Sequence, residues 1–246
     1  MKPSVDIVIP VYNEEKDLPR SILILTEFLQ EHIENPWRIV IADNGSTDST
    51  LSIAEMLSSK YEGVTYLHLG QKGRGRALRR AWLESQADIV SYMDVDLSTD
   101  LNAFPKLLEA LEEGYDIATG TRLGKGAQVR RSLEREVISR GYNLLVKALF
   151  LTRFTDAQCG FKALRREVAS LLVPLIRDQG FFFDSELLII AEKQGVKIKE
   201  VPVEWVEDPD TRVNIPRTVW MDLRGLLRLR FGGIPKPPSE ASKEGR

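Results

Sequence analysis

The sequence predicts an α/β domain built on a mostly parallel sheet with helices on both faces. Short apolar runs rich in β-branched residues alternate with amphipathic segments through the first half of the chain, which is typical of parallel α/β sheets. The 246 residues, 43% of them hydrophobic, suit one sizeable domain and leave little room for a second. Polar clusters also follow three of the expected strands, where ligands bind in such a sheet.

The alternation also gives the order of the expected elements. Strands are expected at 6–11, 37–42, 64–69 and 89–93, and helices from about Leu18, from about Ser49 and over 75–85. The second half is less regular, with helices expected over about 133–150, 166–176 and 185–194 and a strand at 197–203. We interpret it as an extension of the same domain, which then covers 1–231. Residues 235–246 are rich in Pro, Ser, Lys and Glu without periodicity, so the tail 232–246 is expected to be disordered.

Charge and cysteine content exclude several classes of protein. The 34 basic and 36 acidic residues leave a net charge of -2, so no overall field favours nucleic acid. The single cysteine, Cys159, excludes an internal disulfide, and His32 and His68 are too few to complete a Cys/His zinc site. The first residues lack the apolar core of a signal peptide, and no apolar stretch approaches the roughly 20 residues that span a bilayer. We expect an intracellular protein whose contact with a membrane is peripheral.

Two carboxylates flank a single residue directly after the fourth expected strand. Asp94 and Asp96 would lie at the edge of the sheet, where a divalent cation and its phosphate ligands can bind. Mg²⁺ or Mn²⁺ is the natural cofactor for such oxygen ligands. An isolated Asp-x-Asp is more often a pair of solvated loop residues, but its position after a strand, together with the other motifs, favours a metal site.

The loop from Asp43 to Asp48 joins the second strand to a helix. Gly45 suits a tight turn there, and Ser46 or Asp48 can cap the helix. Capping does not explain Asp43, which ends a buried strand on the ligand side of the sheet. We interpret its carboxylate as an acceptor for the ring N–H of a uracil or guanine.

A basic, glycine-rich loop at 72–76 precedes the next helix. Backbone amides and cationic side chains at the start of a helix suit phosphates. A solvated turn has the same composition, so this loop is weak evidence by itself.

Taken together, these motifs resemble family 2 glycosyltransferases, and within that family the dolichyl-phosphate or polyprenyl-phosphate sugar synthases. The motifs occur in the family's order and cover nearly all of residues 5–231. They are Val11-Tyr12-Asn13-Glu14-Glu15, the Asp43–Asp48 loop, Lys72-Gly73-Arg74-Gly75, Asp94-Val95-Asp96-Leu97, Thr119-Gly120-Thr121-Arg122, the run from Asp156 to Lys162, Phe183-Asp184-Ser185-Glu186-Leu187-Leu188 and Glu200-Val201-Pro202-Val203-Glu204-Trp205.

The resemblance implies a GT-A fold and inverting transfer of a hexose from a nucleotide-sugar to dolichyl or polyprenyl phosphate, with Mg²⁺ or Mn²⁺. The run from Asp156 and the segment Thr211–Ile215 are more similar to glucosyl than to mannosyl synthases, which favours UDP-glucose over GDP-mannose. The chain departs from the family at Asn44, where a second aspartate is common. It also departs at Ser98, where some mannosyl synthases have a glutamine. These departures leave the donor and the metal less closely defined than the reaction class.

The resemblance also implies a role for individual residues, with a nucleotide-sugar half at about 1–121 and an acceptor half at about 122–231. The residues assigned to nucleotide-sugar binding are Pro10, Tyr12, Glu14, Asp43, Lys72, Arg76, Asp94 and Val95. The residues assigned to metal binding are Asp94 and Asp96. Catalytic roles fall to Asp96, Asp156, Arg122 and Arg135. The residues assigned to binding the acceptor phosphate are Arg122, Arg131, Arg135 and Ser139.

Several of these assignments have a structural alternative. Arg135 lies between two glutamates and could be a surface salt-bridge residue, and Arg130 competes with Arg131 for the phosphate. Asp156 could be a plain turn residue. Cys159 is interpreted as a packed small residue, because no histidine lies near it in sequence and the inferred mechanism has no thiol step.

The last predicted element is an amphipathic helix over 216–231. Apolar residues recur at helical spacing on one side (Val219, Leu223, Leu226, Leu227) and arginines on another (Arg217, Arg224, Arg228). Such a helix either binds the membrane interface or packs on the domain, and 143–154 is the next candidate for an interfacial segment. The resemblance implies a peripheral protein at the cytoplasmic face of a membrane, and it is compatible with an integral-membrane partner subunit.

Other functions are compatible with parts of the sequence. A sugar-1-phosphate nucleotidyltransferase would need a Gly-rich signature after the first strand, and a processive polysaccharide synthase would need a Gln-x-x-Arg-Trp run; neither is found. A catalytically inactive nucleotide-sugar-binding subunit and a glycosyltransferase with another acceptor are both retained as alternatives.

Overall fold

A computed structural model describes residues 2–207 and 215–237 of the chain. A central sheet has the strand order β3-β2-β1-β4-β7-β5-β8, and a separate small sheet pairs β6 with β9. The strands are β1 (Val5–Val11), β2 (Trp37–Asp43), β3 (Val64–His68), β4 (Ile89–Met93), β5 (Ile117–Thr121), β6 (Gln128–Arg130), β7 (Phe161–Arg165), β8 (Ile198–Pro202) and β9 (Glu204–Val206). Every pairing in the central sheet is parallel except those of β7, which runs antiparallel to β4 and β5. The predicted mostly parallel sheet is confirmed.

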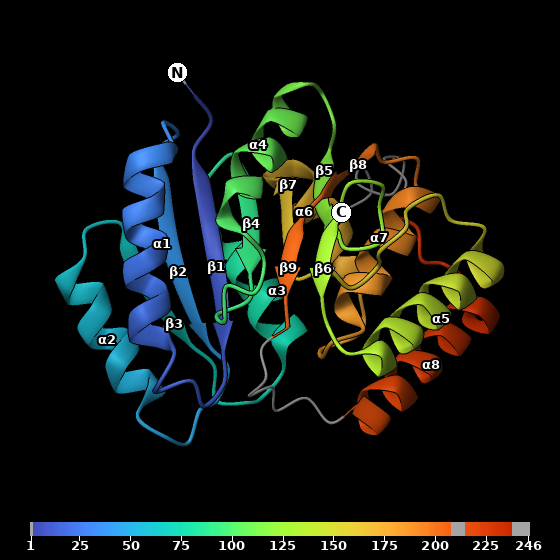
Figure 1. The fold of residues 1–246 in the computed structure, drawn as a ribbon, viewed down its shortest axis with the longest axis horizontal. Helices are drawn as coiled ribbons and strands as arrows, with labels where there is room; N and C mark the ends of the chain where they lie inside the picture. The colour runs from blue at the N-terminus through green and yellow to red at the C-terminus, as the bar shows by residue number, and fades with distance from the viewer. Residues whose placement is uncertain (1, 208–214, 238–246) are drawn as a thin grey trace, which may run out of the picture.

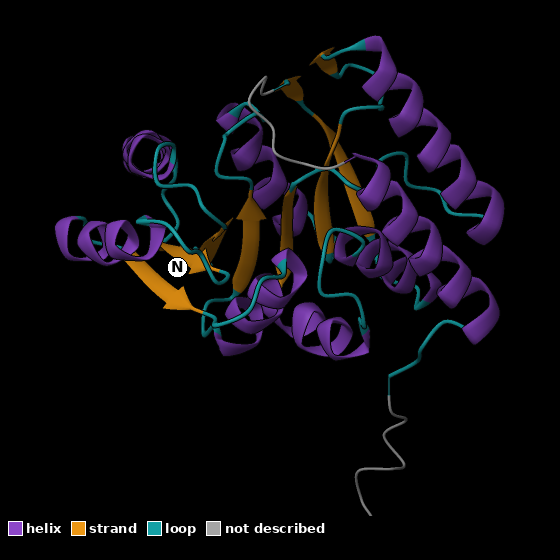
Figure 2. Ribbon diagram, turned by 90° about the horizontal axis from the view of Figure 1, so that it is seen from below, coloured by secondary structure: helices purple, strands orange, loops and turns teal. Residues whose placement is uncertain are grey.

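Helices cover both faces of the sheet (Figures 1 and 2). They are α1 (Leu18–His32), α2 (Thr50–Lys60), α3 (Arg74–Glu84), α4 (Phe104–Glu112), α5 (Leu133–Phe150), α6 (Arg166–Leu172), α7 (Phe183–Lys193) and α8 (Ile215–Gly232), with short 3₁₀ turns at Leu101–Ala103 and Val173–Leu175. The predicted helix at 166–176 is shorter than expected, since Pro174 lacks an amide hydrogen and the chain continues as a 3₁₀ turn.

Alternate residues of the central strands enter two different cores. In β1, Ile7 and Ile9 pack in the cluster that includes residues of α1, α2 and α4. Val8 points to the other face, into the cluster formed with α3, α6 and α7. All seven residues of β1 are buried, because a parallel strand covered on both faces needs apolar side chains on both.

The antiparallel strand β7 was not predicted. Its sequence, Phe161 to Arg165, has two basic residues in five and shows no alternation, so it does not read as a buried strand. Four of its residues are nevertheless buried, including Lys162. The strand brings the acceptor half of the chain into the middle of the sheet, between β4 and β5.

Helices α5 and α8 pack against each other, side by side at one edge of the molecule (Figure 1). α8 includes Gly232, Ile234 packs on the α7 side of the core, and Gln194 Nε2 donates to Pro235 O at 3.0 Å. The ordered chain therefore extends past the predicted boundary at 231. Residues 238–246 of the predicted tail, and residues 211–214 of the segment used to favour glucose, lie outside the described residues.

Candidate active site

The carboxyl ends of β1, β2 and β4 meet at one edge of the sheet. Val11 is the register partner of Asp43, so the loops that follow β1 and β2 start side by side. β4 pairs with the other side of β1, and Asp94 follows its last residue. The three polar clusters identified in the sequence are thus adjacent in space, as a parallel sheet requires.

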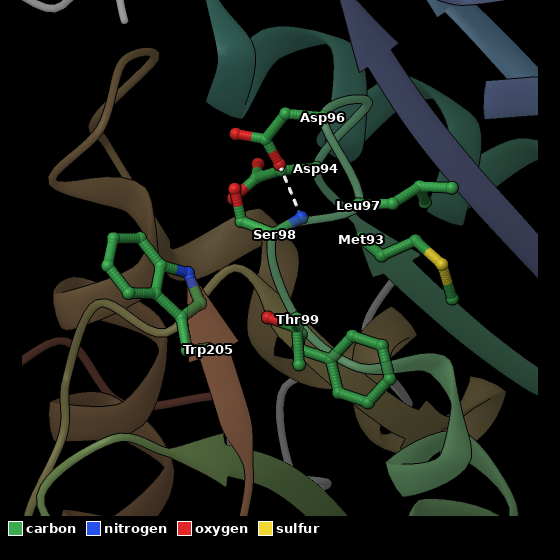
Figure 3. A pocket seen from close by; sticks show the side chains of 8 residues that line it. Met93, Asp94, Asp96, Leu97, Ser98, Thr99 and Trp205 are labelled. Carbon is green, nitrogen blue, oxygen red and sulfur yellow. Dashed lines mark hydrogen bonds between the residues drawn. The ribbon is translucent and has the colours of Figure 1, made fainter. Parts of the chain in front are cut away.

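The turn after β4 holds the two carboxylates of the Asp-x-Asp motif (Figure 3). Asp96 is exposed, and its Oδ1 accepts a hydrogen bond from Ser98 N at 2.9 Å. Val95, between the two aspartates, is buried in the core. Leu97 has φ +49°, a left-handed conformation that costs energy for a leucine and tends to occur at functional turns.

A small pocket lies directly beside this turn. It is lined by Met93, Asp94, Asp96, Leu97, Ser98, Thr99, Phe161 and Trp205. Trp205 belongs to β9 and forms an isolated bridge with Thr99, so the acceptor half closes one wall of the pocket (Figure 3). Segments from before and after residue 122 therefore meet at the Asp-x-Asp turn.

Asp94 is held by an arginine that was not assigned a role from the sequence. Arg74 Nη2 lies 2.5 Å from Asp94 Oδ1, and Arg74 Nη1 lies 2.8 Å from Oδ2 of the buried Asp184. Lys162 Nζ lies 3.0 Å from Asp184 Oδ1, and the Tyr92 hydroxyl donates to the same oxygen. Burial acts to lower the pKa of Arg74, but the charges of Asp94 and Asp184 outweigh it and hold the pKa well above its usual value.

The arginine could have been found from the sequence. It lies inside the basic loop at 72–76, and Asp184 lies inside the Phe183–Leu188 motif. Only the structure shows that these two motifs, 110 residues apart, are joined by an ion pair.

Gly160 lets the loop 155–160 contact Asp94 directly. A Cβ placed on Gly160 would lie 1.8 Å from Asp94 Oδ2, so no other residue fits without moving that carboxylate. The loop 155–160 therefore lies against the Asp-x-Asp turn. This contact places Asp156 in the neighbourhood of the predicted metal site.

The nucleotide side of the site is organised by Asn44 and Lys72. Asn44 Nδ2 donates to Val11 O at 2.7 Å, and Asn44 Oδ1 accepts from Gly73 N at 3.0 Å. Asn44, a departure from the family pattern, thus ties the basic loop to the end of β1. Lys72 Nζ lies 3.5 Å from the centre of the Tyr12 ring, which brings two predicted nucleotide-sugar residues together.

Asp43 is fully buried at the end of β2. Its Oδ1 accepts from Ser46 N at 3.2 Å, across the turn formed by Gly45 at φ +82°, and its Oδ2 lies 2.7 Å from His68 Nδ1. Both oxygens are engaged inside the protein. Its predicted contact with a base would have to share these oxygens with Ser46 and His68.

The remaining nucleotide-side residues lie at the same edge. Pro10 is a buried residue of β1, and Glu14 N donates to Thr50 Oγ1 at 2.8 Å. Arg76 donates through Nη1 to Gln71, whereas its buried Nε has no hydrogen-bond partner among the described residues. These contacts hold the loops in place and leave the predicted ligand roles as predictions.

Arg122 and Asp156 form one bidentate ion pair, although the sequence suggested separate roles for them. Arg122 Nε lies 2.8 Å from Asp156 Oδ2, Arg122 Nη2 lies 3.0 Å from Oδ1, and the backbone amide of Arg122 also donates to Oδ2. Burial acts to raise the pKa of Asp156, but the Arg122 guanidinium outweighs it and lowers the pKa to about 2. The same pairing raises the pKa of Arg122, so both groups stay charged.

The other predicted phosphate residues lie at the start of α5. Arg135 Nε lies 2.7 Å from Glu207 Oε1, and Arg131 pairs through Nε with Glu136. Arg131 Nη2 is buried without a hydrogen-bond partner in the part of the chain that the structure describes. Ser139 accepts through its carbonyl from Asn143 Nδ2 at 3.0 Å. Arg135 is thus ion-paired, which agrees with the alternative that it is a salt-bridge residue, although it is partly buried.

Cys159 is fully buried, as its interpretation as a packed residue requires. Burial is also the main cause that raises the pKa of its thiol to about 12. A thiol with so high a pKa is not a nucleophile at neutral pH.

The Asp-x-Asp turn fits a divalent cation as part of a larger shell. Across residues 2–207 and 215–237, no group of three or more His, Cys, Asp or Glu side chains is placed to hold a metal ion. Mg²⁺ commonly takes only one or two protein carboxylates and fills its shell with phosphate and water. Asp94, 44% exposed, and the exposed Asp96 supply such a pair.

Comparison with known proteins identifies the family. The model of glycosyl transferase family 2 matches residues 6–172. The chain is 30% identical over 226 residues to the dolichyl-phosphate beta-glucosyltransferase of Saccharomyces cerevisiae, covering 82% of this chain and 67% of that protein. It is 34% identical over 218 residues to Glycosyltransferase AglD of Haloferax volcanii, covering 87% of this chain. The chain belongs to glycosyl transferase family 2. It spans 35% of AglD, about a third of that relative's length.

Solved structures show the same fold. Glucosyl-3-phosphoglycerate synthase from Mycobacterium tuberculosis, in complex with Mn²⁺, UDP-glucose and phosphoglyceric acid, matches with a TM-score of 0.70 and 20% identity, covering 96% of this chain and 82% of that one. Its complex with UDP matches with a TM-score of 0.69 and 22% identity, with the same coverage. The predicted GT-A fold is confirmed.

Proposed function

We propose that this protein is an inverting glycosyltransferase that moves glucose from UDP-glucose to dolichyl or polyprenyl phosphate. The observation that carries the proposal is the contact of Asp94 with Gly160, which joins the Asp-x-Asp turn to the loop of the Arg122–Asp156 pair. The activity named for the yeast relative supports both donor sugar and acceptor. The Asp156–Lys162 motif led to the same sugar from the sequence.

On the donor side, Asp94 and Asp96 would hold Mg²⁺ or Mn²⁺. When bound, the ion supplies positive charge to the diphosphate that leaves the sugar. Arg74 fixes the direction of Asp94, because its guanidinium is anchored on the other side by Asp184. Lys72 and the amides of the following helix add positive charge for the diphosphate.

On the acceptor side, the protein needs cations more than a base. A phosphomonoester has a second pKa of about 6, so it is largely a dianion at neutral pH and a competent nucleophile. Arg122 has five N–H donors in its guanidinium, and Asp156 engages two of them through Nε and Nη2. Asp156, with its pKa lowered to about 2, is too weak a base to accept a proton at neutral pH. It keeps Arg122 charged and oriented.

The acceptor's lipid chain requires a surface near the site, and we propose that α5 and α8 supply it. Apolar side chains that are more than half exposed lie on both helices: Leu133, Val137 and Leu144 on α5, and Trp220, Leu227 and Phe231 on α8. None of the helices in the described part of the chain is both long and apolar enough to cross a membrane. Contact through these side chains would be peripheral.

Part of α8 packs on the domain, which is the alternative that the sequence left open for this helix. Leu226 and Leu229 are buried against the domain, and Arg228 makes two hydrogen bonds to the buried Glu186 at 2.9 and 2.8 Å. Leu223 also packs against the core, so part of the predicted apolar side is a packing side. Trp220 and Leu227 remain exposed, with Arg224 between them in sequence at helical spacing.

The proposal is tested by a donor and acceptor screen. UDP-glucose, other UDP-sugars and GDP-mannose are each offered with polyprenyl phosphate and with 3-phosphoglycerate as a soluble phosphate, with Mg²⁺, Mn²⁺ or a chelator. We expect transfer from UDP-glucose to the lipid phosphate, lost with the chelator. Transfer only to the soluble phosphate would refute the acceptor, and binding of UDP-glucose without transfer would identify an inactive subunit.

A further inference from the structure

A carboxylate on β8 holds the loop that carries Asp156. Glu200 Oε1 accepts three hydrogen bonds, from Thr155 N at 2.7 Å, from Thr155 Oγ1 at 2.8 Å and from Asp156 N at 3.1 Å. β8 pairs with β5, and Glu200 is the register partner of Thr119. Glu200 therefore reaches the loop from β8, the strand beside β5, which ends one residue before Arg122.

The hydrogen bonds continue from Thr155 to the segment that contains Arg122. Thr155 Oγ1 lies 2.8 Å from Thr121 Oγ1, and Thr121 Oγ1 accepts from Leu123 N at 3.2 Å and Gly124 N at 3.0 Å. Arg122 lies between these anchored residues, as Asp156 lies next to Thr155. One polar chain thus fixes the backbone on both sides of the ion pair.

The chemistry of the groups sets the direction of this chain. An ionised carboxylate can only accept, so the Thr155 hydroxyl must donate its hydrogen to Glu200. Its oxygen then accepts from the Thr121 hydroxyl, which leaves the Thr121 lone pairs for the two amides. Each bond polarises the next, so the chain has a single arrangement while Glu200 is present.

We propose that Glu200 is a positioning residue for the reaction, which acts through Thr155 and Thr121 to align Arg122 with Asp156. Glu200 itself does not need to touch either substrate. The expected effect of Glu200 on turnover rests on the proposed function of Arg122 at the acceptor phosphate. Its expected effect on the geometry of the Arg122–Asp156 ion pair is independent of that function.

The same loop offers a matched control. Glu192 on α7 accepts from Arg153 N through Oε1 at 3.0 Å and Oε2 at 2.9 Å. It holds the loop three residues before Asp156. Within the described residues, Glu192 has no hydrogen bond to Thr121 or Thr155. Glu192→Ala removes a carboxylate that binds Arg153 N, and it leaves the hydrogen bonds between Glu200, Thr155 and Thr121 intact.

The kinetic test compares Glu200→Ala, Glu200→Gln and Glu192→Ala with the parent. We expect Glu200→Ala to lose roughly 10²-fold in kcat/KM for lipid phosphate, because small misplacement of a positioned group has effects of this size, while KM for UDP-glucose is unchanged. Glu200→Gln should recover most of the loss, since its Oε1 can accept the same hydrogen bonds. Glu192→Ala should behave like the parent. Equal losses in Glu200→Ala and Glu192→Ala would overturn the inference.

A spectroscopic test measures the ion pair without any turnover. The ¹H–¹⁵N signal of Arg122 Nε, assigned with Arg122→Lys, should exchange slowly with solvent in the parent because Nε–H is bonded to buried Asp156. Glu200→Ala should speed the exchange, and so should Thr155→Val, which removes the hydroxyl link and keeps the side-chain shape. Thr155→Ser should not. Slow exchange in both Glu200→Ala and Thr155→Val would refute the inference even if the parent transfers no sugar. A parent without transfer would refute only the proposed function.

Discussion

The proposed donor half, about 1–121, and the proposed acceptor half, about 122–231, place their candidate functional groups in different ways. In the donor half, each polar cluster directly follows its own parallel strand, so neighbouring strands bring the clusters together. In the acceptor half, side chains are placed by ion pairs and hydrogen bonds between distant segments, such as Arg122 with Asp156 and Arg135 with Glu207. From this comparison we expect that an exposed carboxylate such as Asp96 can be removed with little loss of stability, whereas a buried ion-paired group such as Asp156 also stabilises the fold.

The largest expected effect sharpens the donor side of this comparison. Asp96→Ala should reduce transfer by about 10³-fold or more, because the carboxylate would help offset leaving-group charge. Its thermal unfolding should match the parent, since Asp96 is exposed. Turnover and the melting temperature are measured on the same preparation. Full metal-dependent transfer would show that Asp96 is not a metal residue.

Arg122→Ala should combine a loss of transfer with a loss of stability. The change leaves Asp156 buried without its cation, which costs about 3–5 kcal/mol of unfolding free energy when a buried pair is broken. UDP-glucose binding by calorimetry should stay normal, because Arg122 is assigned to the acceptor. Arg122→Ala/Asp156→Ala should be more stable than Arg122→Ala alone. Loss of donor affinity would move Arg122 to the nucleotide side.

A third prediction concerns Asp222, which ties α8 to the acceptor loop. Asp222 Oδ2 accepts from Gln158 Nε2 at 2.7 Å, whereas its buried Oδ1 has no hydrogen-bond partner among the described residues. Burial raises the pKa of Asp222 from 3.8 to about 7, and the nearby Asp178 and Asp184 add to the increase. Burial is the main cause that raises the pKa of the nearby Tyr142, and the charge of Asp222 adds to that increase.

The sign of the pH dependence follows from that increase. Below pH 3.8 Asp222 is mostly protonated in both the folded and the unfolded state. As pH rises from 3.8 through about 7, the unfolded state releases this proton more readily than the folded state, which lowers the free energy of unfolding. Asp222→Asn, which mimics the protonated acid, should therefore be more stable than the parent at pH 8, by at most about 4 kcal/mol. The difference should vanish below pH 4. Denaturation curves across this range measure it, and a constant difference would contradict the assigned cause.

The smallest expected effects concern the membrane contact proposed for α5 and α8. Arg224→Glu should weaken binding to anionic liposomes by about 1 kcal/mol or more, because each basic residue near such a surface contributes about 1 kcal/mol. Trp220→Ser should weaken it as well, whereas Met56→Ser, which changes an exposed apolar residue on α2, should not. Arg228→Glu is unsuitable as a test, since it would face the buried Glu186. A parent that stays unbound at low salt would contradict the proposed membrane contact.

The sequence predicted the donor half well because its signals are local. The alternation of β1 to β4 with helices, and the Asp-x-Asp after β4, can each be read from adjacent residues. β7 was missed because its burial depends on long-range partners: Lys162 is tolerated inside the protein through its ion pair with Asp184.

The sequence singled out Arg122 and Asp156 separately but did not reveal their pairing. Nothing in the sequence around Arg122 indicates that Asp156, 34 residues later, binds it through two hydrogen bonds. Likewise, the arginine side predicted for α8 assumed that Arg228 meets solvent, whereas a glutamate on α7 binds it. Pairings of this kind depend on tertiary structure, which a pattern along one helix does not contain.

The central claim is tested most directly by the stereochemistry of the lipid product. The protein is incubated with UDP-α-glucose, polyprenyl phosphate and Mn²⁺, and the anomeric proton of the glucosyl phosphate is measured by NMR. A single in-line displacement by the acceptor phosphate predicts a β-linked glucose. An α-linked product, or glucose released to water without any lipid product, would contradict the account.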